Sequence, residues 1–463
     1  MAILFKSRAK NPGGFREFLA IAFPLVISNA SISLMHFIDR LMLSWSSPEE
    51  IAACIPAGIF AWMLLSVFIG ISEYTNSFIA QFFGAKRYFS IGAATWQGIF
   101  FSLICGLASL SLLPVGIKIF DLIGHPTDII QYEKTYYSII FSGGTFIILK
   151  ESLSSFYSGR GKTLVVMVVN ILANIFNAVL DYALIFGAWG FPCMGIKGAA
   201  LATVISTIIT CIIFFVLFLS PRNAQKYNTR KVRFDWTLMK RMIRFGAPSG
   251  IHFFLEVSAF TAFIFIIGGI GKLELAASNI ALSLNSLAWL PMLGAGMATA
   301  TVVGQYIGKN DIKNAEKSAY TAVISVEIYM IIFAIIYVCF PTMLLNLFQG
   351  DTTYSDVPFS EIQRYGRIIL LLVAVYQISD AMNITFSGAL RGAGDTRFAM
   401  WANIVFAWVL FIPGTLVTVL YLKQGLIGAW CWATAYISML GIAYLIRFRL
   451  GHWKRIKMIS PPE

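Results

Sequence analysis

The chain has 463 residues, of which 58% are hydrophobic and only 12% carry a charge. Soluble domains average about 25% charged residues, so this composition excludes an ordinary soluble domain and indicates an integral membrane protein. The formal net charge of +13 does not indicate a nucleic-acid partner, because the basic residues lie in short stretches between apolar runs, as topology signals do. The six cysteines show no metal-ligand spacing, so neither a disulfide framework nor a metal centre is expected.

Twelve apolar runs are long enough to cross a membrane as α-helices, which takes about 20 residues each. They are 17–44, 51–78, 91–119, 132–157, 163–187, 194–219, 240–270, 274–301, 315–341, 362–388, 398–421 and 425–449. The first run is too long for the apolar core of a secretory signal, so no cleavable signal is expected. The predicted fold class is therefore an all-α integral membrane protein with twelve transmembrane helices.

The distribution of basic residues predicts the orientation of these helices. If the N-terminus lies in the cytoplasm, the segments on the inner side hold 26 of the 35 Lys and Arg residues. Cytoplasmic loops carry such an excess of positive charge. The sequence therefore predicts a multi-pass protein of the cell (inner) membrane, with both termini in the cytoplasm.

The chain also repeats itself at nearly constant offsets. Pro24, Glu50, Gln81 and Gly84 align with Pro248, Glu274, Gln305 and Gly308, each 224 residues later. Further on, SGRGKT at 158–163 matches LRGAGDT at 390–396, and Asn170 matches Asn403, 233 residues later. A last match joins GIKGAA at 195–200 to GLIGAW at 425–430. The chain is thus predicted to be two homologous six-helix lobes. Because six is even, both lobes enter the membrane in the same direction, and parallel repeats of this kind pack around a central cavity.

The expected division is an N-terminal lobe at 1–220, a cytoplasmic basic linker at 221–244 and a C-terminal lobe at 245–463. Within the linker, Trp236, Met239, Met242 and Ile243 are predicted to share one helical face, apart from the basic side chains. Two interpretations remain open: a helix lying at the membrane interface near anionic headgroups, or a basic anchor for the seventh span.

The fifth span, 169–186, carries four polar residues: Asn170, Asn174, Asn177 and Asp181. Their spacings of four, three and four place them along one stripe of a single helix. A carboxylate in hydrocarbon costs a few kcal/mol and usually faces a cavity or an ion path. The asparagines alone could be interhelical hydrogen-bond partners, worth about 0.6 kcal/mol each. Asp181 on the same stripe favours a functional site.

The first span carries a second acid, Asp39, one turn after His36. Both Asp39 and Asp181 are predicted to lie in the outer half of their helices, where they can meet and share a proton or frame a cation. His36 is expected to be a satisfied interior histidine. Arg40 either faces the outer surface or neutralises Asp39.

The second half repeats the pattern with different residues. Tyr376, Asp380, Asn383 and Ser387 follow the same spacing of four, three and four, with Asp380 near the membrane midplane. Glu256 of the seventh span is predicted at the same depth, where no Lys or Arg of this lobe is expected. These two carboxylates form a second candidate site for a cation or a proton.

Taken together, these residues resemble the MATE (multidrug and toxic compound extrusion) family of transporters, and most closely its NorM-like branch. The resemblance covers nearly the whole chain. It rests on Pro24 with Asp39, QFFGAKRYFSIG at 81–92, FFLEVSAF at 253–260, VGQYIGKND at 303–311 and DAMNITFSGALRGAGDT at 380–396. One departure is AASNIAL at 276–282, where many relatives carry a His-Gln or similar pair.

The resemblance implies efflux of small organic cations by alternating access, driven by inward H⁺ or Na⁺. It implies no cofactor beyond this coupling ion, and no metal other than a Na⁺ at the carboxylates. The coupling site of the N-terminal lobe would fall on Asp39, Asn177, Asp181 and Thr203, and that of the C-terminal lobe on Glu256 and Asp380. Helix 1 would bend at Pro24, the hinge.

Further residues are candidates for contact with the substrate in the cavity. They are Phe37, Asn174, Asn279, Asn285, Trp289, Tyr376, Gln377 and Asn383. The aromatic members, Phe37, Trp289 and Tyr376, could each contribute a cation–π contact of about 0.5–2 kcal/mol. The expected partners are small organic cations and membrane lipids, with no nucleic acid, and the expected state is a monomer.

Other classes of protein fit these residues less well. A major facilitator transporter would carry an acidic-and-basic signature after helix 2, where this chain reads QFFGAKRYFS. A lipid-linked sugar or lipid flippase of the same superfamily is the nearest alternative, but it calls for a cationic cavity and the mid-depth residues are acidic. Two lobes with separate acidic sites favour a carrier over a channel. No catalytic triad order, zinc spacing or phosphate loop is found, so an enzyme is not expected.

Overall fold

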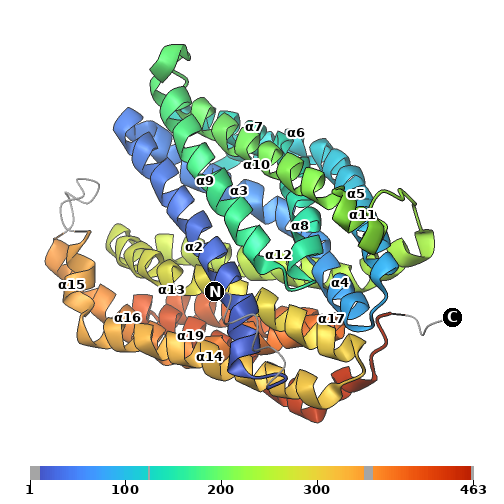
Figure 1. Cartoon of the computed structure of the whole chain (residues 1–463). Coiled ribbons are helices and arrows are strands. Elements are labelled where there is room, and N and C mark those ends of the chain that lie inside the picture. Colours follow the sequence, from blue (N-terminus) through green and yellow to red (C-terminus); the bar gives the residue numbers. More distant parts are fainter. Residues whose placement is uncertain (1–10, 124–125, 349–357, 460–463) are drawn as a thin grey trace.

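The computed structural model describes residues 11–123, 126–348 and 358–459, and those residues form helices and no strand (Figure 1). The first lobe consists of α2 (Phe15–Ser46), α3 (Pro48–Glu73), α4 (Thr75–Gly84), α5 (Tyr88–Ser109), η1 (Leu110–Leu112), α6 (Leu113–Ile123), α7 (Thr127–Ser142), α8 (Gly144–Ser158), α9 (Thr163–Phe186), η2 (Ala188–Gly190) and α10 (Ile196–Phe218), followed by the short α11 (Pro221–Tyr227). The second lobe consists of α12 (Trp236–Gly268), α13 (Lys272–Gly308), α14 (Ile312–Cys339), α15 (Pro341–Asn346), α16 (Phe359–Ala393), α17 (Thr396–Asn403), η4 (Ile404–Phe411), α18 (Ile412–Leu420), α19 (Gly425–Leu450) and η5 (His452–Arg455).

The number of membrane spans agrees with the sequence prediction. In the described parts of the chain, eleven helices are long and apolar enough to cross a membrane. The pair formed by α7 and α8 bends by 41° and makes a twelfth span if it is taken as one helix. The all-α fold with twelve transmembrane helices is therefore confirmed.

Three spans are less regular than the apolar runs suggested. The second span breaks at Tyr74 and continues as α4 to Gly84, beyond the predicted end at residue 78. The fourth span bends at Gly143. The eleventh span contains a π-helical stretch, η4, directly after Asn403. Segments of π-helix are rare and occur frequently at functional sites.

The linker matches its prediction in part. Met239, Met242 and Ile243, three of the four residues expected on one apolar face, lie together against the first lobe, whereas Trp236 is exposed. They lie in the first turns of α12, which continues without a break into the seventh span. The reason is packing, because the other lobe covers one side of these turns and membrane or water meets the other. The separate short helix of the linker is α11.

Side-chain caps determine where several helices begin. The hydroxyl of Ser47 accepts the backbone N–H groups of Glu49 and Glu50 at the start of α3. Asp235 caps α12 in the same way, and Asp311 caps α14. Hydrogen bonds from the side chain and backbone of Asn314 lower the pKa of the Asp311 carboxyl. Each of these caps satisfies an amide that the helix itself leaves unpaired.

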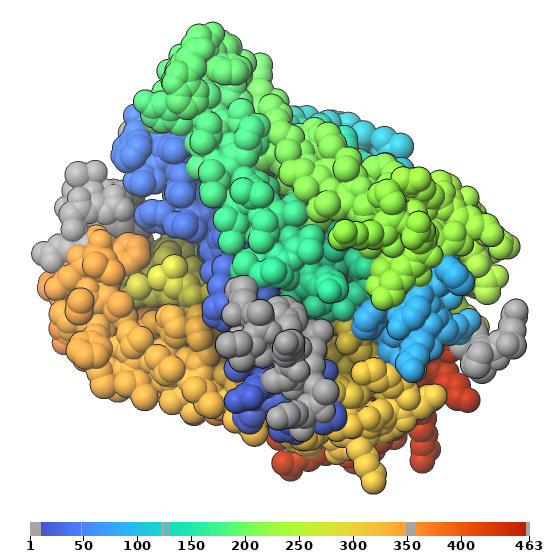
Figure 2. All heavy atoms as spheres, viewed as in Figure 1, coloured from blue at the N-terminus to red at the C-terminus, as the bar shows by residue number. Residues whose placement is uncertain are grey.

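The two lobes diverge at one end of the molecule and meet at the other. In Figure 1 the blue-to-green helices of the first lobe spread away from the yellow-to-red helices of the second, and they converge near α4 and α17. Figure 2 shows a recess between α2 and the orange part of the second lobe, with α13 visible inside it. We call the end where the lobes converge the α4 end.

The lobes cross each other through pairs of helices related by the repeat. A Cβ at Gly294 of α13 would lie 2.5 Å from the carbonyl carbon of Leu25 in α2, next to Pro24. Its repeat equivalent, Gly70 of α3, would meet the Cα of Gly250 in α12 at 2.7 Å. The second helix of each lobe therefore touches the first helix of the other, and glycine permits this close approach.

A second symmetric contact closes the α4 end, and we call it the paired-glutamine contact. The Gln81 amide donates to the carbonyl of Gly392 at 2.9 Å, and the Gln305 amide donates to the carbonyl of Gly159 at 2.8 Å. Both glutamines and both acceptor glycines are repeat equivalents. A Cβ at Gly84 would overlap the carbonyl oxygen of Gln305, and one at Gly308 would overlap that of Gln81.

Other polar contacts between the lobes lie close to the paired-glutamine contact. The guanidinium of Arg391 lies 3.4 Å from a carboxylate oxygen of Glu73, and the Tyr74 hydroxyl donates to the carbonyl of Arg391 at 3.1 Å. The Asn76 amide donates to the Thr301 hydroxyl at 3.0 Å. The α4 end is therefore closed by hydrogen bonds as well as by apolar packing.

Candidate functional site

The structure brings together the four residues that the sequence assigned to the coupling site of the first lobe. When the Asn177 amide is oriented to match its neighbours, its nitrogen lies 3.1 Å from Asp39 Oδ1 and 3.2 Å from Asp181 Oδ2. Its oxygen then accepts the backbone N–H of Thr203 at 3.3 Å. The Thr203 hydroxyl bonds instead to Ala199 of its own helix, so Thr203 contributes through its backbone.

The two carboxyl groups of this site, which we call the N-lobe acid pair, are buried. Asp39 is 6% exposed and Asp181 is not exposed at all. Two carboxylates that are removed from water and adjoin one amide cannot both stay charged without a proton or a cation to compensate them. The N-lobe acid pair is therefore able to take up a proton or a small cation.

Both basic neighbours of Asp39 can now be placed. Arg40 is exposed, and among the described residues it forms no salt bridge with Asp39. The alternative in which Arg40 neutralises Asp39 by direct pairing therefore finds no support. The ring of His36 lies 4.0 Å from Asp39, and its side chain is 51% exposed. The expectation of a satisfied interior histidine was wrong, because half of the His36 side chain is exposed.

Sequence reasoning missed two residues beside the N-lobe acid pair. Tyr136 of α7 and Cys54 of α3 lie next to each other and within range of both carboxylates. Neither residue carries a signal of its own, because a lone tyrosine or cysteine in an apolar run usually belongs to the core. Only the packing of α3 and α7 against α2 and α9 reveals their position.

The other two asparagines of the α9 stripe connect helices. The Asn170 amide donates to the Ser28 hydroxyl at 2.8 Å, and the Asn174 amide donates to the Ser31 hydroxyl at 2.9 Å. Both bonds join α9 to α2. They match the structural alternative for these residues, interhelical hydrogen bonding within the membrane.

We expect Asn174→Ala to lower the free energy of unfolding by about 0.6 kcal/mol and to leave gradient-driven transport unchanged. The reason is that the variant removes one interhelical hydrogen bond outside the N-lobe acid pair. Thermal unfolding in detergent measures the first quantity and efflux from proteoliposomes the second. Ser31→Ala removes the other partner of the same hydrogen bond, so it should have the same free energy of unfolding and the same transport as Asn174→Ala. A loss of transport in Asn174→Ala alone would instead make this residue a substrate contact.

In the second lobe, Asp380 is buried and accepts a hydrogen bond from the Asn383 amide at 3.1 Å. Glu256 of α12 lies within range of its charge. Tyr436 and Tyr444 of α19 also lie within range of the charge of Glu256. The structure thus places the two predicted acids near each other. Asn403, at the start of the π-helical stretch, lies beside Tyr436, but the two side chains form no hydrogen bond.

The nearest basic residue of this lobe, Arg391 of α16, is paired with an acid of the other lobe. Its guanidinium lies 3.4 Å from a carboxylate oxygen of Glu73, and its charge acts on Glu256 only at longer range. The expectation that no Lys or Arg of this lobe lies at the depth of Glu256 and Asp380 stays a prediction.

The remaining candidates for substrate contact fall into three groups. Phe37, at 62% exposed, and Asn279 are exposed, and Trp289 is half-buried. The Gln377 amide donates to Asn285 at 3.4 Å, joining α16 to α13. Tyr376 is buried beside Asp380, so its ring face is covered in this conformation.

The lobes differ at the position of the N-lobe acid pair. By the repeat offsets, Asp39 corresponds to Phe263 and Asp181 to Gly414. The ring of Phe263 packs against Phe411 at 5.2 Å and Trp430 at 5.5 Å. Where the first lobe holds two acids, the second lobe therefore holds an aromatic cluster, and its own acids sit elsewhere.

Further charged residues inside the spans were not singled out from the sequence. Among them, Glu73 pairs with Arg391 across the lobes, and Lys150 pairs with Glu151 at 3.2 Å on α8. Within the described residues, no group of three or more His, Cys, Asp or Glu side chains could hold a metal ion.

Parallel six-helix repeats with buried acids in each half define a membrane transporter. The MatE family model matches residues 24–183 and again residues 248–417. The chain therefore belongs to the MatE family, and it is a transporter and not an enzyme. The two matched segments begin at Pro24 and Pro248, the prolines that the repeat aligns.

Known relatives extend over almost the whole chain. The probable multidrug resistance protein NorM of Thermotoga maritima is 27% identical over 449 residues, which cover 96% of this chain and 94% of that protein. The multidrug resistance protein MdtK of Photorhabdus laumondii is 27% identical over 410 residues, 86% of either chain. The predicted resemblance to the NorM-like branch is confirmed.

Solved structures share the fold. An outward-facing multidrug resistance MATE family transporter matches with a TM-score of 0.87 at 19% identity, over 97% of this chain and 98% of that chain. The eukaryotic MATE transporter AtDTX14 matches with a TM-score of 0.85 at 21% identity, over 95% and 96%. At such identities the similarity demonstrates the common fold alone.

Proposed function

We propose that this protein is a secondary active multidrug efflux antiporter of the cell (inner) membrane. It exports small organic cations in exchange for inward H⁺ or Na⁺, works as a monomer and needs no cofactor beyond the coupling ion. The observation that carries the proposal is the N-lobe acid pair, two buried carboxylates that form no salt bridge with a Lys or Arg among the described residues. The names of the NorM and MdtK relatives support multidrug substrates.

Coupling in this proposal requires only that ion and substrate favour different conformations. A proton or Na⁺ that binds the acids stabilises one arrangement of the lobes, and an organic cation stabilises another. With both termini in the cytoplasm, the α4 end faces the cytoplasm and is closed in the conformation described above. Uptake of a substrate from inside then requires the paired-glutamine contact to part, with Pro24 as a hinge beside the crossing at Gly294.

The charges near the cavity support cations as substrates. The basic side chains Lys150 and Arg391 are each paired with a carboxylate, whereas Asp39 and Asp181 form no salt bridge with a Lys or Arg in the described part of the chain. Phe37 and Trp289 remain candidates for cation–π contact. The flippase alternative would need unpaired basic side chains to hold a pyrophosphate, so the observed pairing counts against it.

A test is efflux of a fluorescent organic cation from proteoliposomes under separate H⁺ and Na⁺ gradients. We expect one of the two gradients to drive transport by the wild type. If the coupling ion passes through the second lobe, Glu256→Gln or Asp380→Asn should reduce this transport at least tenfold. Unchanged transport in these two variants, with loss in variants of the N-lobe acid pair, would confine coupling to the first lobe. Transport of lipid-linked sugars without cations would refute the proposal.

A further inference from the structure

The linker between the lobes exposes five consecutive residues, Arg230 to Phe234, in which three basic side chains are interleaved with two apolar ones. Val232 is 60% exposed and Phe234 is 49% exposed. Trp236, the first residue of α12, is 64% exposed, and its ring stacks on that of Phe234 at 6.2 Å. We call residues 230–236 the linker patch.

The linker patch has a fixed shape, because α5 holds its backbone. The indole of Trp96 donates to the carbonyl of Thr229 at 2.8 Å. The Gln97 side chain donates to the carbonyl of Arg233 at 2.9 Å and accepts the backbone N–H of Asp235 at 3.1 Å. These bonds occupy the backbone and leave the side chains of Lys231 and Arg233 exposed. Arg230 donates through Nε to the carbonyl of Leu219 at 3.1 Å, and one side of the Phe234 ring packs on Phe100 at 5.6 Å.

The charge of the linker patch is not neutralised by the protein. Among the described residues, no salt bridge involves Arg230, Lys231 or Arg233. The one acid of the segment, Asp235, caps α12 through Leu238. Because Trp236 begins a membrane span, the patch lies at the depth where tryptophan rings meet lipid headgroups.

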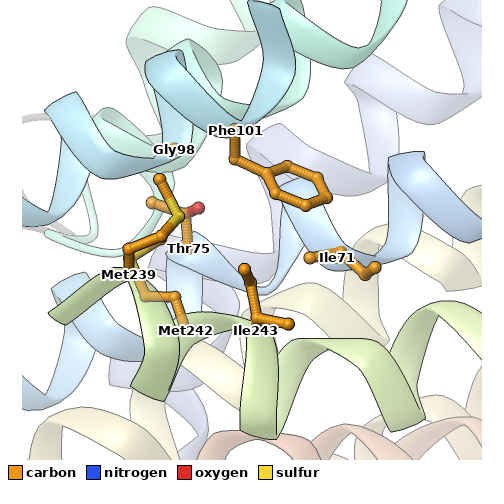
Figure 3. A pocket seen from close by; sticks show the side chains of 7 residues that line it. All are labelled: Ile71, Thr75, Gly98, Phe101, Met239, Met242 and Ile243. Carbon is orange, nitrogen blue, oxygen red and sulfur yellow. The ribbon is translucent and has the colours of Figure 1, made fainter. Parts of the chain in front are cut away.

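A small, mostly apolar cleft lies at the seam between the two lobes, and its lining on α12 begins one turn after Trp236 (Figure 3). It is lined by Ile71, Thr75, Gly98 and Phe101 of the first lobe and by Met239, Met242 and Ile243 of α12. The exposed Lys240 and Arg244 follow Trp236 by one and two turns on α12. Positive charge and apolar surface therefore lie side by side along the seam.

We propose that the linker patch binds an anionic phospholipid of the leaflet that faces the α4 end. Its headgroup contacts Arg230, Lys231 and Arg233, and its acyl chains lie against Phe234, Trp236 and the mouth of the cleft. Anionic headgroups attract basic side chains at this depth, and aromatic rings cover the first methylene groups. Because the patch is held on α5 and the cleft borders α12, the bound lipid stabilises contact between the lobes.

Lipid retention tests this proposal without any transport assay. The full-length protein is extracted from vesicles that hold equal amounts of phosphatidylglycerol and phosphatidylcholine, and the retained lipids are identified by native mass spectrometry. We expect a preference for phosphatidylglycerol that Lys231→Gln/Arg233→Gln reduces about tenfold. Within the described residues, the side chains of Lys231 and Arg233 form no hydrogen bond, so the variant should fold normally.

A matched control removes the same charge elsewhere at the α4 end. Arg449→Gln/Arg455→Gln changes two exposed basic residues outside the linker patch, and it should keep the preference. Phe234→Ser/Trp236→Ser should reduce retention of both lipids. An equal loss of the phosphatidylglycerol preference in the linker variant and in the control would attribute the preference to general surface charge and overturn the proposal. Unchanged retention in Lys231→Gln/Arg233→Gln would overturn it as well.

Discussion

Asp39→Asn and Asp181→Asn should each reduce gradient-driven efflux at least tenfold while the protein still folds. The physical reason is that an amide has nearly the size of a carboxylate but takes up neither a proton nor a cation's charge. Both positions are buried, and Asn177 bridges them, so the loss of one carboxylate leaves the other without its coupled partner. Efflux of a fluorescent cation from proteoliposomes measures the effect.

Two controls separate coupling from folding in this experiment. Asp121→Asn changes an acid in an exposed salt bridge with Lys134 and should leave transport unchanged. Equilibrium exchange of substrate, measured without an ion gradient, should survive in the site variants if only coupling is lost. Full gradient-driven transport in both Asp39→Asn and Asp181→Asn would show that the N-lobe acid pair does not couple.

The repeat and the polar stripe account for most of what sequence could predict. Constant offsets and apolar runs predicted twelve spans in two lobes, and the spacing of Asn177 and Asp181 predicted one helix face. Depth counted along the helices then predicted that Asp39 and Asp181 meet. These features depend on chain geometry alone, which is the same in every α-helix.

The features that sequence could not predict depend on packing between elements. The guanidinium of Arg391 pairs with Glu73 of the other lobe, and counting residues along α16 gives no direction for a long side chain. Met239 and Met242 are buried because the other lobe happens to cover them. Tyr136 and Cys54 reach the N-lobe acid pair only through the packing of α3 and α7. Helical periodicity carries no information about such neighbours.

The paired-glutamine contact leads to the second large expected effect. Gly84→Ala and Gly308→Ala should each move the lobes apart at the α4 end, because either Cβ would overlap a backbone carbonyl of the opposite lobe. Overpacking of this kind costs about 1–3 kcal/mol, which changes a ratio of two conformations about 5- to 150-fold. We expect a shift toward the conformation open at the α4 end and a loss of efflux of at least tenfold.

Spin-label distances can follow this shift directly. Phe89 and Lys313 are exposed repeat equivalents, one in each lobe near the α4 end. Labels on cysteines at these positions, in a chain whose six native cysteines are replaced, should report longer distances in both glycine variants. Gly268→Ala is the matched control, since its Cβ would lie 3.8 Å from the nearest atom, a side-chain carbon of Leu275. It should keep the native distance and native transport.

A variant that adds no atoms tests whether the hydrogen bonds of the paired-glutamine contact stabilise the closed α4 end, or whether only the close approach of the glycines does. Gln81→Ala/Gln305→Ala removes both hydrogen bonds to the glycine carbonyls without adding any atom, at a net cost of about 0.5–1.5 kcal/mol per bond. If the contact stabilises the closed end, this variant should shift the labels in the same direction as Gly84→Ala, but less far. Native distances in the glutamine variant would leave only the close approach of the glycines to close the α4 end. Native distances in the glycine variants as well would mean that the lobes tolerate the added atoms and that closure rests on the surrounding contacts, Glu73 with Arg391 among them.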